Sequence, residues 1–286
     1  MPDVWSLAAI AAKFTLYCGV LTAAGTVIAG LLFRLDQYRR LAFFTAFTGL
    51  FAAFLVFSLR GANLTGDASG MTDPEMLGLL WSTPVGTALS FRVAGLALLI
   101  LGLVLGRAGR WLSVLGGIMA IWSFDHVGHV SGRDTTLLDI ALTVHLIAVA
   151  LWIGILSPLK RLAKKQETWP VAADVGHQFG LVASVTVPML ILAGGYMSYI
   201  LVGSFDALVN TGYGQALIVK VTFVAGLLAL AAANKLRFIP GLRANDPKAA
   251  GHLAKSITIE WIVVLIILAI TAILTTNSTL PTGAPT

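Results

Sequence analysis

The sequence predicts an all-α polytopic membrane helix bundle with eight transmembrane helices. Of its 286 residues, 57% are hydrophobic and only 11% are charged, and the mean hydropathy is +0.88. A soluble domain carries about 25% charged residues. Apolar stretches of about 20 residues, the length that crosses a bilayer, recur along the whole chain. We therefore expect residues 1–286 to form a single transmembrane domain without a soluble domain.

The eight predicted spans follow one another with short connections. The first is longer than a bilayer requires, so we expect its first residues to lie in the membrane interface. It is also too long for the apolar core of a cleavable signal peptide and lacks a basic lead. The spans are 4–33, 41–59, 86–106, 111–130, 137–156, 179–202, 215–234 and 257–275.

The basic residues predict the orientation. Fourteen of the 19 Lys and Arg residues fall in four alternate loops, at 34–40, 107–110, 160–165 and 235–255. By the positive-inside rule these loops are cytoplasmic, which places both termini in the periplasm of a multi-pass protein of the bacterial inner membrane. The net charge of +6 then reflects topology and contact with the lipid bilayer, and not nucleic-acid binding.

Ionisable side chains gather at the end of the fourth predicted span and in the fifth. Asp125 and His129 are four residues apart and His126 and His129 three apart, so each pair shares a helix face. The connection to the next span is short, so His145 should lie on an antiparallel neighbour. Ionisable groups inside a membrane persist mainly at a partner or a pathway. Imidazole suits copper or zinc, so these four residues are a candidate metal site, and a structural polar cluster is the alternative.

Softer ligands occur nearby. Met119 and Cys18 lie inside predicted spans, and Met71 and Met76 lie in the longest outer loop, at 60–85. Thioether and thiol sulfur atoms favour Cu(I), although the same residues are common in ordinary core packing. Pro74 precedes a short apolar run that could begin a surface helix in this loop.

Three further ionisable residues fall within the spans. Arg92 can reach the interface by snorkelling, and Lys220 can pair with an acidic group or tune the field felt by a passing cation. Glu260 lies near the cytoplasmic start of the last span. The sequence has no nucleophile elbow, phosphate-binding loop, HExxH or CxxC motif, so a transporter is favoured over an enzyme.

The second half of the chain, about 137–276, resembles the CopD family of bacterial copper resistance and copper transport membrane proteins. A small residue followed by histidine, as at Gly128–His129, often precedes the fifth helix of that family. The other segments that carry the resemblance, in order, are HLIAVALWIG (145–154), YGQALIVK (213–220), ANKLRFIP (233–240) and SITIE (256–260).

The resemblance implies a protein that moves copper ions across the inner membrane. It points to His129 and His145 as copper contacts and to Lys220 and Glu260 as polar positions of unknown role. Members often act beside a periplasmic copper-binding protein of the CopC type. Because no such domain is fused here, we expect that partner to be separate.

A haem protein is the alternative. Two imidazoles on facing helices can ligate haem b, and Arg60, Arg92 or Arg133 could meet its propionates, as in membrane cytochromes that oxidise quinol or transfer electrons. The sequence does not distinguish Cu(I) from Cu(II) and does not give the direction or coupling of transport.

Overall fold

The protein is an all-helical bundle in the computed structural model, which describes residues 4–35, 38–128 and 136–276. Within these ranges seven helices are long and apolar enough to cross a membrane. They are α1 (Val4–Leu32), α2 (Arg39–Thr65), α4 (Pro84–Val104), α6 (Thr136–Ala163), α7 (Trp169–Val202), α9 (Gly212–Ala233) and α11 (Pro247–Thr276). The shorter elements are η1 (Ala68–Met71), α3 (Pro74–Trp81), α5 (Arg110–Trp122), η2 (Ser123–His126), η3 (Gln166–Thr168), α8 (Phe205–Asn210), η4 (Asn234–Phe238) and α10 (Ile239–Arg243).

The predicted span 111–130 differs from the expectation, so seven long helices are described in place of eight. It contains α5, a helix of 13 residues, followed by the 3₁₀ turn η2. Thirteen residues cover about 20 Å, less than the roughly 30 Å of a hydrocarbon core. Ser123 Oγ donates to the carbonyl of Ala120, Val127 has an extended backbone, and Gly128 has a φ of 119°. These residues end the α-helix early and leave a polar turn at its end.

Several other predicted elements are confirmed with changed bounds. The surface helix expected after Pro74 is α3, whose first turn is capped by the carboxylate of Asp73. Helices α7 and α11 begin about ten residues before their predicted starts, since the added stretches contain polar residues such as Asp174 and His177 in α7 and Lys248 and Lys255 in α11. Hydropathy detects the apolar part of a helix and does not detect a polar extension beyond the bilayer.

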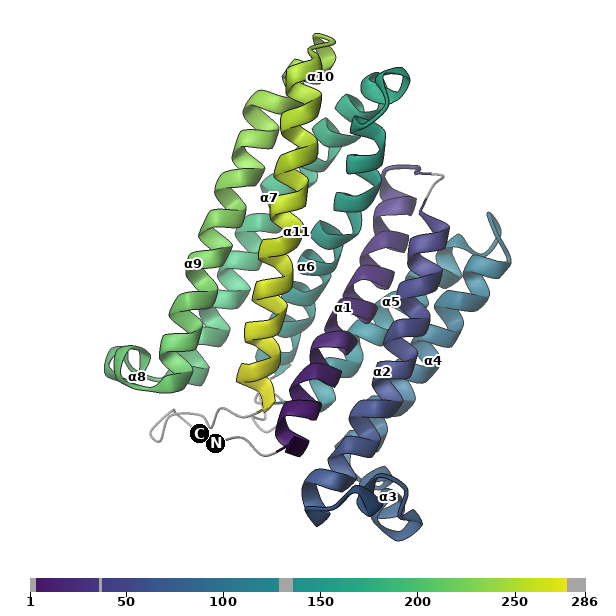
Figure 1. The fold of residues 1–286 in the computed structure, drawn as a ribbon, viewed down its shortest axis with the longest axis vertical. Helices are drawn as coiled ribbons and strands as arrows, with labels where there is room; N and C mark the ends of the chain where they lie inside the picture. The colour runs from purple at the N-terminus through teal and green to yellow at the C-terminus, as the bar shows by residue number, and fades with distance from the viewer. Residues whose placement is uncertain (1–3, 36–37, 129–135, 277–286) are drawn as a thin grey trace.

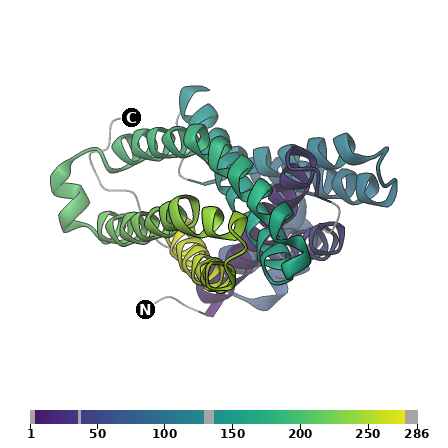
Figure 2. The same cartoon turned by 90° about the horizontal axis from the view of Figure 1, so that it is seen from above.

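Helix α1 lies at the centre of the bundle, between the helices of the first half and those of the second (Figures 1 and 2). It packs against α2, α5, α6 and α11, and its residues from Val20 to Ala29 are almost fully buried. A Cβ atom built on Gly25 would lie 1.7 Å from the Ala150 carbonyl oxygen, and one on Gly154 would lie 2.0 Å from the Gly25 carbonyl carbon. The backbones of α1 and α6 therefore touch directly.

The second half is arranged around α6 and α11. Helix α7 packs along α6, and α9 packs on α11. Between α7 and α9 the short helix α8 turns the chain back, as Figure 1 shows. Near its end α9 passes through η4, a five-residue π-helical segment, before α10. Interruptions of this kind are rare in α-helices and frequently occur at functional sites.

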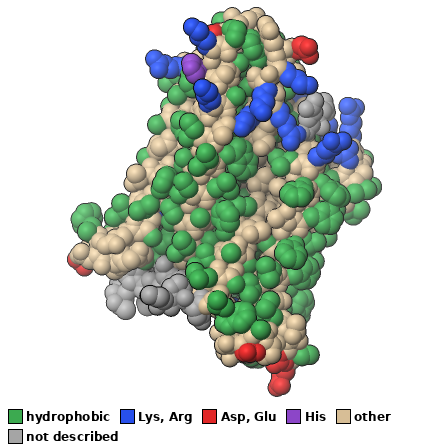
Figure 3. Space-filling view, in the orientation of Figure 1, with side chains coloured by type: hydrophobic (Ala, Val, Ile, Leu, Met, Phe, Trp, Pro, Cys, Tyr) green, Lys and Arg blue, Asp and Glu red, His purple; other side chains and the backbone are tan. Residues whose placement is uncertain are grey.

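Charge is distributed unequally between the two ends of the bundle. Lysine and arginine side chains gather at the end formed by the loops before α2, after α6 and around α10, whereas acidic side chains are visible at both ends (Figure 3). Lys13 Nζ in α1 donates to the Thr275 carbonyl at 2.6 Å, so α1 begins where α11 ends. The end that holds Lys13 and Thr275 lies opposite the basic end (Figure 1).

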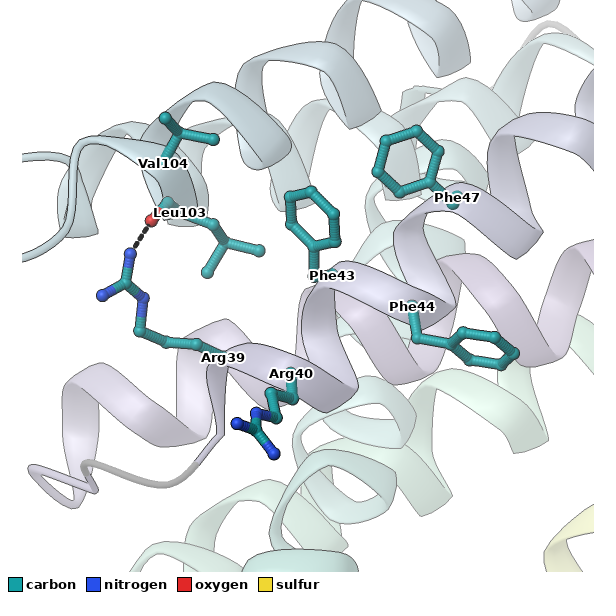
Figure 4. A pocket seen from close by; sticks show the side chains of 7 residues that line it. All are labelled: Arg39, Arg40, Phe43, Phe44, Phe47, Leu103 and Val104. Carbon is teal, nitrogen blue, oxygen red and sulfur yellow. Dashed lines mark hydrogen bonds between the residues drawn. The ribbon is translucent and has the colours of Figure 1, made fainter.

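A groove lies between α2 and α4 at the basic end (Figure 4). Its guanidinium groups lie at the start of α2, and one of them, from Arg39, donates to the carbonyl of Leu103 in the last turn of α4. A cation is favourable there because the last carbonyls of a helix lack intrahelical partners. The groove is lined by Arg39, Arg40, Phe43, Phe44, Phe47, Leu103 and Val104.

The contact between α1 and α6 predicts a stability difference between two glycine substitutions. Gly154→Ala inserts a methyl group into the Gly25 backbone, and overpacking of this kind costs about 1–3 kcal/mol. Gly195→Ala in α7 adds the same group where no atom lies within 4 Å, so it should be neutral or stabilising. Thermal unfolding of the purified protein should show a lower melting temperature for Gly154→Ala alone. Equal melting temperatures would contradict the close packing.

Candidate functional site

The candidate site begins with the turn η2 at the end of α5, which packs against α4 and α6. Asp125 is 8% exposed, and its Oδ2 accepts a hydrogen bond from Thr143 Oγ1 of α6 at 2.6 Å. Its Oδ1 is buried and has no hydrogen-bond partner among the described residues. Buried polar atoms are nearly always hydrogen-bonded, so this oxygen requires an explanation.

His126 presents a second atom of the same kind. Its ring lies beside Phe91 of α4, with centroids 5.0 Å apart, and beside Trp122, with centroids 5.8 Å apart. Its Nδ1 is buried and lacks a hydrogen-bond partner in the part of the chain that the structure describes. Two consecutive residues, Asp125 and His126, thus each hold an unpartnered polar atom of a type that binds metal ions.

His145 lies further along α6 and contacts α7. Its Nδ1 is 3.3 Å from the carbonyl oxygen of Leu190, and its ring lies close to Gly194. In the tautomer that donates from Nδ1, the Nε2 atom keeps its lone pair for a ligand. Thr143, which contacts Asp125, is two residues away, or about 200° around the helix. The side chains of Thr143 and His145 therefore leave α6 on different sides.

The four predicted ligands are not all described. His129 lies outside the described residues, at the start of the segment between η2 and α6. Within the described ranges no three His, Cys, Asp or Glu side chains lie close enough together to hold one metal ion. The site of Asp125, His126, His129 and His145 therefore stays a prediction.

Arg92 holds η2 in place from inside the bundle. Its side chain is 5% exposed, and its Nε donates to Ser123 Oγ at 3.0 Å. Its guanidinium carbon lies 5.0 Å from the centre of the Phe124 ring, which stacks on Tyr17 of α1. Arg92 thus joins α4 to η2 instead of snorkelling to the interface, and the aromatic pair joins η2 to α1.

The sulfur-containing candidates are dispersed. Cys18 is half-buried in α1, and Met119 is half-buried in α5. Met71 and Met76, also half-buried, belong to η1 and α3 at the end opposite the basic loops. In the same segment Asp67 accepts the Ser69 amide at 2.8 Å, and this hydrogen bond keeps the pKa of the Asp67 carboxyl below its usual value.

The other two ionisable residues predicted within the spans, Lys220 and Glu260, differ in their surroundings. Lys220 of α9 is half-buried. Glu260 of α11 is 2% exposed and accepts hydrogen bonds from Trp152 Nε1 of α6 at 3.2 Å and from Asn234 Nδ2 at 2.5 Å. Sequence reasoning did not assign roles to Thr143, Ser123, Trp152 or Asn234, since none of them is charged.

Two family models match the chain. Residues 1–139 match the model described as copper resistance protein D-like, N-terminal domain, and residues 173–274 match that described as copper resistance protein D. The chain belongs to the copper resistance protein D family. The buried core of this family member contains residues from both matched regions, such as Leu21 and Ile257.

Two curated relatives are similar to about half of the chain. The inner membrane protein YebZ of Escherichia coli (strain K12) is 27% identical over 157 residues, 52% of this chain and 53% of YebZ. The copper transport protein CutJ of Bacillus subtilis (strain 168) is 26% identical over 145 residues, 50% of this chain and 26% of CutJ. The chain thus matches about half the length of one relative and a quarter of the other. No solved structure matches it.

The role of Ser123 in holding Arg92 can be measured. Ser123→Ala leaves the buried Nε of Arg92 without its acceptor, and an unsatisfied buried donor costs about 1–3 kcal/mol. Ser198→Ala is the matched control, because the Ser198 hydroxyl bonds only the Gly194 carbonyl of its own helix. Thermal unfolding should show a clearly lower melting temperature for Ser123→Ala and a nearly unchanged melting temperature for Ser198→Ala. Equal decreases in melting temperature would mean that the hydrogen bond from Arg92 to Ser123 does not stabilise the fold.

Proposed function

We propose that this CopD-family membrane protein moves copper ions across the bacterial inner membrane and admits them from the periplasmic side at the outer ends of α5 and α6. The observation that carries the proposal is the pair of buried, unpartnered atoms Asp125 Oδ1 and His126 Nδ1 in one turn. The family membership supports copper as the substrate, as does the name of the relative CutJ, a copper transport protein.

The chemistry of the turn suits a copper ion on its way into the bundle. His126 offers an imidazole nitrogen and Asp125 a carboxylate oxygen, and copper binds both kinds of atom. Thr143 fixes the carboxylate through Oδ2 and leaves Oδ1 to the ion. Hydrogen bonds that orient a ligand in this way increase metal affinity. We propose that His129, which follows this turn in the sequence, supplies a further nitrogen.

His145 is proposed as the next contact inward. The Leu190 carbonyl orients its ring, and Nε2 is the atom left for copper. A protonated Lys220 on α9 would weaken cation binding in this part of the bundle, which favours passage over retention. A conducting site must bind its ion strongly enough for entry and weakly enough for release.

The outer segments supply the proposed entrance. We assign the basic end of the bundle to the cytoplasm by the positive-inside rule, so α3, η2 and both termini face the periplasm. The half-buried thioethers of Met71 and Met76 are suited to capturing Cu(I) at this entrance. A separate periplasmic copper protein of the CopC type is the proposed donor.

Copper binding tests the site directly. His126→Ala and His145→Ala should each lower copper affinity of the purified protein by about tenfold or more, because each removes a nitrogen ligand. His252→Ala is the matched control, since His252 lies in α11 with its ring against Phe238, at the end of the bundle that the predicted topology assigns to the cytoplasm. Equilibrium dialysis gives affinity and stoichiometry, and unchanged values in both variants would exclude these histidines. A Soret band in the purified protein would instead favour a di-histidine haem b cytochrome.

The proposed orientation gives an independent prediction. In a Cys18→Ser background, Glu75→Cys should react with a membrane-impermeant thiol reagent added to intact spheroplasts, whereas Lys164→Cys should react only after lysis. Both positions are exposed and lie in the two oppositely assigned ends. The reverse labelling pattern would place the basic end in the periplasm and would remove the proposed direction of entry.

A further inference from the structure

A second buried polar cluster surrounds Glu260 and contains none of the proposed copper ligands. The side chain is 2% exposed in the middle of the bundle. Its two carboxylate oxygens have separate partners, with Oε2 accepting from Trp152 Nε1 of α6 and Oε1 accepting from Asn234 Nδ2 at the start of the π-helical segment η4. Three elements thus converge on one carboxylate.

No basic side chain within the described ranges forms an ion pair with this carboxylate. Lys235, adjacent to Asn234, instead donates to the Gly180 carbonyl and to Ser184 Oγ of α7. Arg243 of α10 pairs with Asp174 at 3.1 Å, and Lys13 of α1 bonds the Thr275 carbonyl.

The other ionisable residues on the helices that pack around Glu260 lie away from its carboxylate. On α11 itself Lys255 is five residues earlier and therefore on another face. Lys220 precedes Asn234 by 14 residues, or about 20 Å along the helix axis, and Arg237 of η4 is exposed. On α6 the flanking ionisable residues are Asp139, His145, Lys160 and Arg161. A buried carboxylate without a counter-ion is unfavourable, so a group in this position tends to take up a proton or a cation.

The partners of Glu260 suit both of its protonation states. Trp152 can only donate, and it serves a carboxylate oxygen or a carboxylic C=O equally. The Asn234 amide donates from Nδ2 to the carboxylate, while its Oδ1 is buried and unpartnered among the described residues. A rotation of the amide would present Oδ1 to the O–H of a protonated Glu260. Ser256 Oγ, one turn earlier on α11, is also buried and unpartnered in the described part of the chain.

The cluster is connected to the proposed copper path through α6. Trp152 follows His145 by seven residues, so both lie on one stripe of the helix, about 10 Å apart along its axis. Two opposite charges about 10 Å apart change each other's binding affinity by about tenfold or more at an effective dielectric constant of about 20, so a cation held near His145 can weaken proton binding by a carboxylate held by Trp152.

We propose that Glu260 is a proton-binding site within the membrane, and that copper at the His145 level promotes release of its proton. The first part stands on the cluster alone, and the linkage rests on the proposed copper function. The released proton passes from the Glu260 carboxyl to water at the basic end of the bundle. Binding of Na⁺ by the same oxygen atoms is the competing outcome.

Infrared difference spectroscopy of the full chain in lipid tests the proton site without copper. A buried carboxylic acid gives a C=O band that disappears as the pH rises. We expect such a band in the wild type and in the exposed control Glu75→Gln, and its loss in Glu260→Gln. Trp152→Phe, which keeps the carboxyl, should raise the frequency of the band because it removes a hydrogen bond. A wild type without this band, or a band that Na⁺ removes at constant pH, would overturn the assignment.

Copper-linked proton release tests the second part. Calorimetric titration with copper in buffers of different ionisation enthalpy counts the protons released. All three proteins should bind copper. The wild type and Glu75→Gln should release more protons per bound copper ion than Glu260→Gln, by up to one proton. Equal counts would refute the linkage. A wild type that binds no copper would refute the proposed function and the linkage together, and the infrared result would still decide the proton site.

Discussion

The close backbone contact between α1 and α6 is the constraint on which the rest of the bundle depends. Helices in a bilayer gain little from hydrophobic burial against one another, so their association relies on packing of small residues and on hydrogen bonds. Gly25 and Gly154 allow the two backbones to touch, and Gly19 makes a similar approach to Gly49 of α2. Since α1 also contacts α5 and α11, this packing positions both polar clusters around one central helix.

The two clusters share α6 but lie at different levels of it. In the first turns of α6 Thr143 holds Asp125, and His145 contacts α7. About two turns further along α6, Trp152 holds Glu260 of α11. The outer group carries nitrogen and carboxylate ligands suited to copper, whereas the inner group has oxygen atoms and donors suited to a proton. One rigid helix thus connects a proposed metal site with a proposed proton site.

The sequence predicted the class of fold and the polar positions better than it predicted their partners. Hydropathy located seven long helices, and the excess of Lys and Arg in alternate loops agrees with the basic end of the structure. It overestimated the span at 111–130, because apolar residues flank the polar turn that ends α5. A charged residue inside a predicted span identified Glu260 as a position of interest. Asn234 and Trp152 carry no charge, and their roles become visible only when the packed helices show that they bond Glu260.

The sequence also could not predict which neighbouring helix each side chain contacts. Residues 143 and 145 lie in one apolar stretch, and only the positions of the neighbouring helices decide which of them meets η2. Arg92 had a simple explanation as an interfacial residue, yet it lies buried against Ser123 and Phe124. Spacing within one helix is fixed by its period, whereas the pairing between helices depends on tertiary packing.

X-ray absorption spectroscopy at the copper edge, on wild-type protein loaded with one equivalent of copper, tests the proposed copper site most directly. The ligands proposed at η2 and α6 predict a first shell of nitrogen and oxygen with the outer-shell scattering of imidazole rings. A first shell made only of sulfur, without imidazole scattering, would place the copper at the methionines or Cys18 and would contradict the histidine site.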